Sequence, residues 1–507
     1  MDRLSAPAES LARRAAVLAL AFGASGAAAV AGSFVVAGDG PAFLVTAVAS
    51  TLLYLLPDAL VTWGILTLGE YGRPLLAVAA AVGTVALFAA LVAGVVRLAG
   101  QLNRSRADAL FGAFLVQTVA AFALTVRPLA ALAAGAAGGV TLAVAGRAVT
   151  DPDARTVPDR RAVLRAVGAA GAAAGIGWLV APRAADLPDE TVEDEGVLAL
   201  LEAADERSLG VPGIDPLVSD GFYQVDINTS TPVVDREAWE LTVSGGPTEF
   251  AVDYDDLTDR EGEHRFVTLR CVSDELNGRT MDTALWTGVP VADLLAEAEA
   301  PAECCVRIEA HDGYYQGFPR AALERGFLAW RMNGELLPRG HGHPVRLLIP
   351  GHWGEINVKW VTGIEVRDEE VTGYWEERGW HGTGPVETVA KIHAVEPRGD
   401  GTVLVGGHAY AGTRGVDRVE VSTDGGETWT DATLSDRLPG AAPADGEARV
   451  EGVAADAWRM WRHEYEADEP HEVVARAVEP DGTVQPAEES DAFPSGATGW
   501  VRRTVEP

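Results

Sequence analysis

Residues 266–272 read FVTLRCV, an apolar stretch that predicts a buried β-strand ending at a cysteine. Two segments that carry basic residues follow it, RMNGELLPRGHGHPVRLLIPG at residues 331–351 and NVKW at residues 357–360. The cysteine, Cys271, is one of three in the chain. Because the thiolate form of a cysteine is a metal ligand, Cys271 is the first candidate for chemistry.

The chain divides into two parts of different character. Its 507 residues include 40 basic and 73 acidic side chains, a formal net charge of −33. Residues 1–185 hold 14 arginines against 9 acidic residues, which leaves 26 basic against 64 acidic for residues 186–507. This acidity would repel nucleic acid, and high salt would screen the self-repulsion. With only two lysines, Lys359 and Lys391, the acidic surface is typical of a halophile's protein.

Cysteine and histidine usage restricts the cofactors. Cys304 and Cys305 are adjacent in a strand-like stretch, CCVRIEA, and we expect them to be small, buried apolar residues. The absence of CxxC and CxxCH argues against iron–sulfur clusters, attached haem and a zinc ribbon. All ten histidines fall at or after His264, which argues against a membrane cytochrome b.

The first third of the chain predicts a helical membrane region. A span needs about 20 apolar residues, and we expect five spans, near residues 15–37, 43–67, 75–96, 108–126 and 128–146. Their alanine and glycine content would let helices approach closely. Pro57 and Asp58 predict a kink in the second span. Asp58 is either functional, or it lies near the membrane interface or a water-filled cavity and has no role. A transporter is a weaker alternative, because no internal repeat is evident.

Residues 159–182, DRRAVLRAVGAAGAAAGIGWLVAP, admit two interpretations. Arg160 and Arg161 before an Ala/Gly-rich apolar stretch resemble a twin-arginine export signal, here inside the chain. The alternative is a plain sixth span. Both place the rest of the chain on the extracytoplasmic side of the cell membrane. We expect a membrane region, a signal-like segment with an acidic linker, a catalytic domain and a sandwich at residues 1–150, 151–204, 205–385 and 386–507.

The part beyond the linker resembles the sulfite oxidase family of mononuclear molybdenum enzymes. The likeness is carried by FVTLRCV, WTGVPVADLL (286–295), HDGYYQGFP (311–319) and, above all, residues 331–351. It implies an α+β domain that binds a molybdopterin cofactor with its molybdenum, followed by an all-β, immunoglobulin-like dimerisation domain. Turn signals at Asp424-Gly425 and Asp481-Gly482, between short alternating strands, independently favour an antiparallel sandwich.

The resemblance also implies roles for single residues. Cys271 would be the molybdenum ligand. His341 and Arg346 would hold the terminal phosphate of the cofactor, and Lys359 would contact the pterin, since cationic groups suit phosphate and oxygen acceptors. Asn228 is the polar residue best placed to contact the pterin, with a plain turn-forming role as the alternative.

Two residues are candidates for the substrate side. Tyr314 stands five residues before Pro319, the spacing of the family's active-site tyrosine, and a phenol can hydrogen-bond a substrate oxygen without adding charge. Tyr315 and His311 are its rivals. Arg414 lies in the loop that in the family carries a substrate-facing arginine.

Departures from the family concern the substrate. Sulfite oxidases carry arginines where this chain has Gln224-Val225-Asp226 and Val272-Ser273-Asp274-Glu275. Carboxylates there should repel a small dianion. Compensating cations could come from Arg279, Arg270 or Arg320.

We therefore expect a membrane-anchored molybdenum oxidoreductase that transfers an oxygen atom to or from a small oxyanion, S-oxide or N-oxide. Electrons would leave through an external carrier or a membrane quinone. A dedicated sulfite oxidase or dehydrogenase is the alternative, with sulfite slightly disfavoured. A non-catalytic, surface-anchored interaction protein is an alternative of another class. The resemblance also implies a homodimer formed through residues 386–507.

Overall fold

The computed structural model describes residues 6–38, 40–68, 71–146, 149, 160–181, 187, 194–225, 227–302, 304–446 and 452–507. The chain forms two compact units. The helical unit comprises residues 1–186 with 228–233, and the mixed unit comprises residues 187–227 with 234–507. Some predictions concern residues outside this described part. These are residues 151–159 of the signal-like segment, residues 188–193 of the acidic linker, and Asp226.

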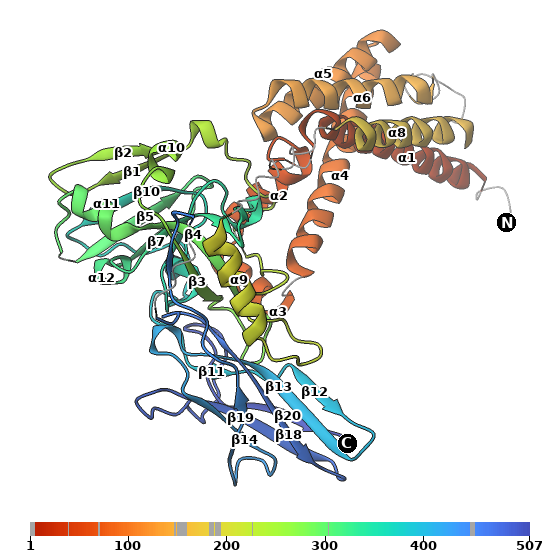
Figure 1. Ribbon diagram of the computed structural model, residues 1–507. Helices are drawn as coiled ribbons and strands as arrows, with labels where there is room; N and C mark the ends of the chain where they lie inside the picture. Colours follow the sequence, from red (N-terminus) through yellow and green to blue (C-terminus); the bar gives the residue numbers. More distant parts are fainter. Residues whose placement is uncertain are drawn as a thin grey trace. The chain divides into compact units, whose positions relative to one another are not determined.

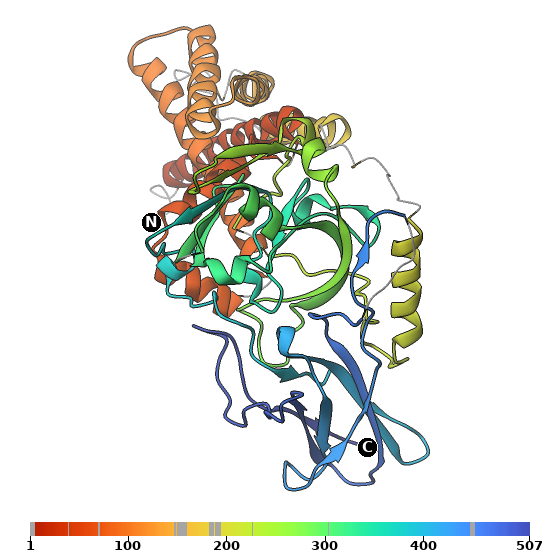
Figure 2. The same ribbon diagram turned by 60° about the vertical axis from the view of Figure 1, so that its left-hand side comes forward.

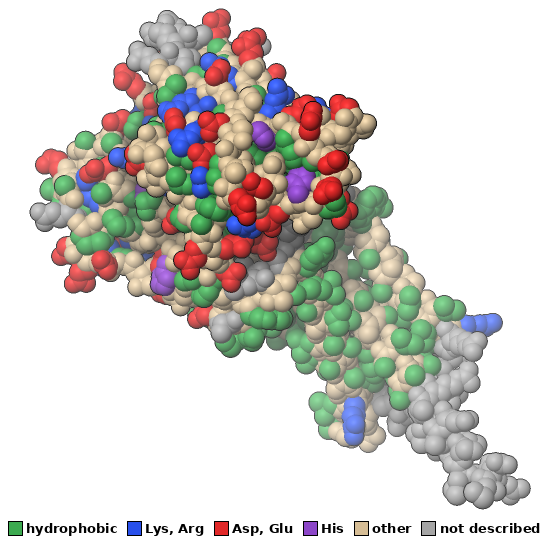
Figure 3. All heavy atoms as spheres, turned by 90° about the horizontal axis from the view of Figure 1, so that it is seen from below, with side chains coloured by type: hydrophobic (Ala, Val, Ile, Leu, Met, Phe, Trp, Pro, Cys, Tyr) green, Lys and Arg blue, Asp and Glu red, His purple; other side chains and the backbone are tan. Residues whose placement is uncertain are grey.

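The described part of the helical unit consists of helices joined by short connections (Figure 1). They are α1 (Ala6–Ala37), α2 (Leu44–Leu55), α3 (Asp58–Leu68), α4 (Gly72–Gln101), α5 (Arg106–Thr125), α6 (Pro128–Ala145) and α8 (Arg160–Val180). Five helices in this described part are long and apolar enough to cross a membrane: Ala15–Ala37, Gly72–Gln101, Arg106–Thr125, Pro128–Ala145 and Arg161–Val180. Hydrophobic side chains dominate the face of this unit seen in Figure 3.

The predicted second span, near residues 43–67, is interrupted at the predicted kink. Helix α2 ends at Leu55, and α3 begins only at Asp58. Leu56 is extended, with φ −69° and ψ 138°. Pro57 explains the break, because proline disfavours a helical conformation in the residue before it.

Small residues bring the helices of this unit close together, as expected. The Gln117 side chain of α5 donates from Nε2 to Ser25 Oγ of α1 (2.9 Å), and Ser25 Oγ donates to the carbonyl oxygen of Gly138 in α6 (3.0 Å). A Cβ atom on Gly138 would lie 1.7 Å from Gln117 Oε1. A larger residue at this position would displace the Gln117 side chain, so glycine favours the close packing of α5 and α6.

The first part of the mixed unit is an α+β domain with two sheets (Figure 1). One has the strand order β2-β1-β10-β5-β6, formed by Phe250–Asp253, Glu240–Ser244, Val361–Arg367, Cys305–Ala310 and Tyr315–Pro319. The other has the order β17-β3-β4-β7-β8, with β9 also paired to β7: Ala442–Pro443, Glu263–Arg270, Met281–Pro290, Phe327–Met332, Glu335–Leu336 and Arg346–Leu348. The helices are α9 (Glu195–Arg207), α10 (Tyr254–Thr258), α11 (Val291–Glu297) and α12 (Arg320–Leu323).

Strands β3 and β4 form the centre of the second sheet and are curved (Figure 2). Every residue of β4 except its last is buried. Tyr410, from the following sandwich, donates from its hydroxyl to the carbonyl oxygen of Thr268 in β3 (3.0 Å) and to Asp456 Oδ1 (2.6 Å). The Thr268 N–H donates to the carbonyl oxygen of Asp456 (3.1 Å). The later part of the chain thus packs directly on the strand that leads to Cys271.

The remaining strands form the predicted β-sandwich. Its first sheet has the order β11-β13-β18-β16, with β12 paired to β13: Val389–Ala390, Thr402–Tyr410, Arg459–Glu466, Thr433–Leu434 and Ala394–Pro397. Its second sheet has the order β15-β14-β19-β20: Thr430–Asp431, Arg418–Ser422, His471–Val478 and Val501–Val505. Acidic side chains are spread over the face of the mixed unit in Figure 3.

The expectation for the adjacent cysteines is confirmed for Cys305, which is buried, and wrong for Cys304. Cys304 and Cys305 form a disulfide with each other, and Cys304 is exposed. Cys304 has a positive φ of 58° just before β5 begins and therefore does not continue the strand. A sequence pattern of buried strand residues cannot reveal a turn at its first residue.

Candidate active site

Cys271 lies one residue beyond β3, at the start of a tight loop. Its N–H donates to the carbonyl oxygen of Thr280 (3.0 Å), and its own carbonyl oxygen accepts from the N–H of Asp274 (3.0 Å). The thiol is buried, 3.1 Å from Ser273 Oγ. Burial raises the pKa of the Cys271 thiol. A buried thiol of this kind becomes a thiolate when a cation binds it.

Asp274 anchors the loop from inside the protein. Its Oδ2 accepts hydrogen bonds from Arg270 Nε (3.1 Å) and Lys391 Nζ, and its Oδ1 accepts from the Thr280 hydroxyl (2.8 Å). Burial alone would raise the pKa of Asp274, but Lys391 and Arg270 hold it below its usual value. The expectation that Asp274 repels an anionic substrate is therefore wrong, because two buried cations match its charge. The guanidinium of Arg270 donates to Asp274 and to the carbonyl oxygens of Glu387 and Ala497. Because these contacts occupy its nitrogens, it is not available to a substrate.

Arg346 is a buried cation with an incomplete set of partners. It lies in β9 above the ring of Trp286 (5.0 Å) and donates to the carbonyl oxygens of His341 (3.1 Å) and Asn357 (3.3 Å). Within the described part of the chain, its buried Nε has no hydrogen-bond partner. Burial lowers the pKa of Arg346 to about 10. Such a group requires an anion.

The turn before β9 brings the other predicted basic residues to Arg346. Lys359 Nζ donates to the carbonyl oxygen of Gly340 (3.0 Å), in the turn that holds His341. Gly342 has a φ of 116°, and a Cβ there would lie 2.9 Å from Arg346 Cβ and 3.2 Å from Lys359 Cα. Glycine is therefore necessary for this turn to approach both residues. The structure brings His341, Arg346 and Lys359 together.

Two aromatic residues connect the basic group to Cys271. Phe222 packs edge-on against His341 (5.5 Å between ring centres) and is stacked with Tyr223 (5.5 Å). A Cβ built on Gly354 would lie 2.7 Å from Tyr223 Oη and 3.6 Å from Cys271 Cα. Burial raises the pKa of Tyr223 well above its usual value, and a thiolate at Cys271 raises it further. The site therefore extends from the thiol across Tyr223 and Phe222 to the cations.

Tyr314 is the member of its aromatic pair that faces this region. Its hydroxyl donates to the carbonyl oxygen of Glu355 (2.8 Å), one residue after Gly354. Burial raises the pKa of Tyr314 well above its usual value, with further contributions from Glu355 and from Cys271. Tyr315 instead lies under the guanidinium of Arg307 (4.9 Å) in a more open setting.

Comparisons with known proteins agree with this geometry. The oxidoreductase molybdopterin binding domain matches residues 228–375, and the Mo-co oxidoreductase dimerisation domain matches residues 385–500. The chain therefore carries both domains of a molybdopterin oxidoreductase of the sulfite oxidase type. The mitochondrial sulfite oxidases of Rattus norvegicus and Homo sapiens are 30% and 31% identical to it over 308 residues, 50% of this chain and 54% of each relative. The chain thus spans about half the length of these relatives.

Among solved structures, the sulfane dehydrogenase SoxCD from Paracoccus pantotrophus aligns with a TM-score of 0.45 and 22% identity, over 55% of this chain and 78% of that chain. The predicted family, fold class and molybdopterin cofactor are confirmed by the two domain matches and the curated relatives.

The residues present fit the cofactor of the sulfite oxidase family. A molybdopterin phosphate would supply the anion that the unpartnered Arg346 Nε lacks, and Cys271 would supply a thiolate to the metal. The close approach enforced at Gly342 leaves backbone, rather than side chain, beside Arg346 and Lys359. These are the features that a pterin phosphate would require.

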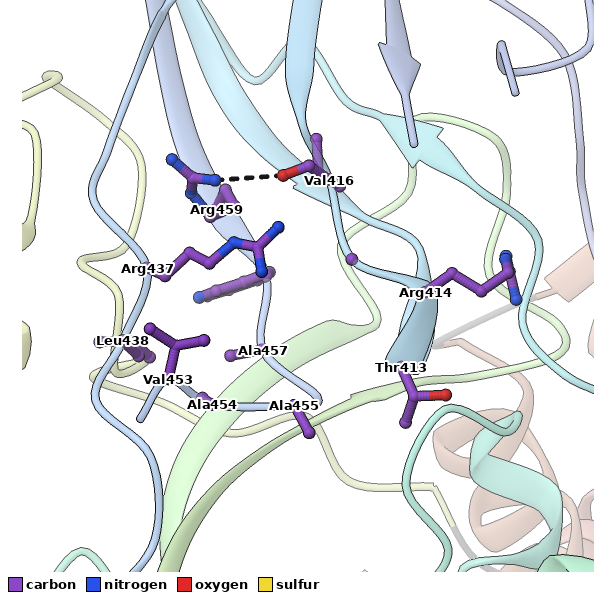
Figure 4. Close-up of a pocket in the computed structure, with 12 residues that line it drawn as sticks. Thr413, Arg414, Val416, Arg437, Leu438, Val453, Ala454, Ala455, Ala457 and Arg459 are labelled. Atoms are coloured by element: carbon purple, nitrogen blue, oxygen red, sulfur yellow. Dashed lines mark hydrogen bonds between the residues drawn. The ribbon is translucent and has the colours of Figure 1, made fainter. Parts of the chain in front are cut away.

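Arg414 occupies a different environment from the other candidates. Its Nε donates to Glu479 (3.0 Å), and its Nη2 donates to the carbonyl oxygen of Val386 (2.9 Å) and to the hydroxyl of Thr388 (3.0 Å). Figure 4 shows its guanidinium pointing away from Arg437 and Arg459, which line the same cavity of about 250 Å³. Its substrate-facing role stays a prediction.

Asn228 belongs to residues 228–233, which are part of the helical unit. There the hydroxyl of Thr229 lies 2.8 Å from that of Ser50. The role of Asn228 in cofactor binding stays a prediction. Within the mixed unit, Tyr223 and Glu355 belong to the site but were not predicted from the sequence. The Phe/Tyr-rich character of the stretch around residue 222 was the available signal for Tyr223, whereas Glu355 in a Trp-Gly-Glu turn had none.

Proposed function

We propose that this chain is a membrane-anchored molybdenum oxidoreductase that transfers an oxygen atom between water and a small sulfur- or nitrogen-containing compound. The observation that carries the proposal is that one site contains both the buried thiol of Cys271 and the guanidinium of Arg346, whose Nε has no hydrogen-bond partner among the described residues. A thiolate and a phosphate-binding cation are what a pterin-bound metal needs from a protein.

Each side chain has a distinct task in this proposal. Arg346, His341 and Lys359 hold the cofactor by its phosphate and pterin, and Cys271 binds the metal. The bound cofactor supplies the oxygen-atom and electron transfer. Tyr314 presents a neutral hydroxyl that can orient a substrate oxygen, because burial keeps its pKa well above neutral pH. The Asp274 cluster keeps the Cys271 loop in place.

Electrons would pass to a separate carrier or to a membrane quinone, because the sequence has no CxxC or CxxCH motif for a haem or an iron–sulfur cluster. The five long apolar helices support anchoring in the cell membrane. We further propose that the mixed unit lies on the extracytoplasmic side and dimerises through residues 386–507, and that its acidic surface is suited to high salt.

Sulfite oxidation is the second candidate, and one observation favours it. The Asp274 carboxylate, which would have opposed a dianion, is matched by Arg270 and Lys391. The relatives named above are sulfite oxidases. Reduction of an S-oxide or N-oxide is the opposite direction of the same chemistry.

Metal analysis and two assays test the proposal. Purified full-length protein should contain about one molybdenum per chain, and Cys271→Ser should abolish turnover while Cys304→Ser leaves it intact. The enzyme is assayed with sulfite plus an electron acceptor, and separately with a reduced dye plus sulfoxides. A well-folded protein without molybdenum would instead support the non-catalytic interaction protein.

A further inference from the structure

Two glutamates and a glutamine form a buried polar cluster next to Tyr314. The Gln316 side chain, in β6, donates from Nε2 to Glu355 Oε1 (3.1 Å) and to Glu376 Oε1 (3.0 Å). Glu355 belongs to the 3-10 turn η4 (Gly354–Ile356), and Glu376 begins η5 (Glu376–Arg378). One amide group thus bridges two carboxyl groups.

This cluster has more acceptors than donors. Three buried oxygens, Gln316 Oε1, Glu355 Oε2 and Glu376 Oε2, have no hydrogen-bond partner among the described residues. A buried acceptor without a donor is costly, and two buried carboxylates side by side also repel each other. A proton on one carboxyl group would remove both penalties, since it supplies a donor and cancels one charge.

The packing around these oxygens favours a proton over a larger cation. A Cβ on Gly382 would lie 2.0 Å from Glu355 Oε2, and one on Gly373 would lie 2.3 Å from Glu376 Oε2. Backbone therefore covers both oxygens closely. No group of three or more His, Cys, Asp or Glu residues in the described part of the chain could hold a metal ion.

The charged neighbours supply little compensation. Tyr314 and Asp312 lie in the turn before β6, and Cys271 lies beside Gly354 of η4. These three side chains are neutral or acidic, so they do not compensate a second negative charge. On η5, Glu377 adds another carboxylate, which lies 3.9 Å from Arg378 Nη1. Arg378 donates to the carbonyl oxygen of Tyr374 and lies over its ring at 3.7 Å.

We propose that Glu355 and Glu376 share one proton and that this acid pair exchanges protons with the active site. The proposal deepens the function proposed above and rests on it. Transfer of an oxygen atom from water to a substrate releases two protons and two electrons; the electrons go to the carrier. The pair takes up one of the protons and then releases it to solvent, and the reverse reaction draws a proton from it.

The pair is connected to the site through η4. The carbonyl oxygen of Glu355 accepts the hydrogen bond of the Tyr314 hydroxyl, and the preceding residue, Gly354, packs against the backbone of Cys271. Burial raises the pKa of Glu355, and the Glu376 carboxylate raises it further. Because Glu355 and Glu376 act through neighbouring groups, they are positioning and proton-holding residues and do not contact the reacting atoms.

Infrared spectroscopy tests the shared proton without relying on turnover. Spectra of the full-length protein are recorded at about pH 8, above the pKa values of about 7 and about 6 that burial gives Asp456 and Asp282. We expect a protonated-carboxyl stretch that shifts in D₂O and is lost in Glu355→Gln. In Glu376→Gln, removal of the like charge should lower its titration midpoint by at least about one pH unit. The exposed Glu369→Gln is the matched control.

The kinetic consequence is measured on the same variants. In the reductive direction, in which the pair donates a proton, the alkaline limb of the kcat profile should move to lower pH in Glu376→Gln and stay in place in Glu369→Gln. Absence of a carboxyl band that responds to residue 355 or 376 would overturn the proposal even in an active enzyme. If wild-type protein shows the carboxyl band but contains no molybdenum or has no activity, the shared proton is supported and the proposed function is refuted. If Glu355→Gln does not fold, the half-buried Glu376 still provides the midpoint test.

Discussion

Lys391 Nζ donates a hydrogen bond to Asp274 Oδ2, and both side chains are completely buried. Lys391 directly follows β11, the strand that opens the sandwich, whereas Asp274 lies three residues after Cys271. Arg270 Nε approaches the same oxygen (3.1 Å). The loop that carries the thiol is thus fixed by a cation from the following domain, so the two domains build the site jointly.

Removing Asp274 should destabilise the protein more than removing Lys391. Asp274→Ala leaves two buried cations without their carboxylate, and we expect a loss of about 3–5 kcal/mol in the free energy of unfolding. Lys391→Met leaves Asp274 paired with Arg270, so about 1–3 kcal/mol should be lost. Urea unfolding at constant salt measures both, with the exposed Glu275→Ala as control. Equal losses in the two variants would contradict this account of the cluster.

Arg346→Met should separate stability from cofactor retention. Without cofactor, replacement of a buried, incompletely partnered guanidinium by an apolar side chain of similar length should leave stability unchanged or higher. Loss of the phosphate contact should reduce bound pterin and molybdenum at least about tenfold. Metal and pterin content of the purified protein is the measurement, and the surface variant Arg367→Met is the control. Wild-type metal content in Arg346→Met would show that this residue does not hold the cofactor.

Gly342→Ala should damage the same site through the backbone. Its φ of 116° is unfavourable for alanine, and the new Cβ would meet Arg346 and Lys359. Strained positions of this kind cost about 1–3 kcal/mol, and the turn carrying His341 should move away from the basic group. We expect a lower melting temperature together with loss of pterin. Gly384→Ala, where a Cβ has open space, should retain both.

The sequence predicted the parts of the site that depend on local pattern. An apolar run that ends at a cysteine identified β3 and Cys271, and the basic segments identified His341, Arg346 and Lys359. The partners that these residues meet were not predictable, because they come from distant parts of the chain. Asp274 looked like a repelling carboxylate until Lys391, 117 residues later, was found beside it. Glu355 and Glu376 are likewise 21 positions apart and are brought together beside Gln316.

The pH dependence of stability should reveal the buried acid pair. Glu355 has a folded-state pKa raised by burial and by Glu376 to about 9, above its ordinary value of 4.5. Its protonated form is favoured by folding, so its contribution to stability is fully present below pH 4.5 and declines as pH rises toward 9. Glu355→Gln cannot ionise and keeps its stability over that interval.

Unfolding free energies of the two proteins, measured from pH 5 to 9 at constant salt, test this sign. The advantage of Glu355→Gln over wild type should grow with pH, by at most about 1.4 kcal/mol per unit for a single proton. Using the difference between two proteins cancels the many other acidic groups of this chain, which titrate alike in both. A difference that stays constant, or that shrinks as pH rises, would mean that Glu355 is ionised in the folded protein and that the two carboxylates share no proton.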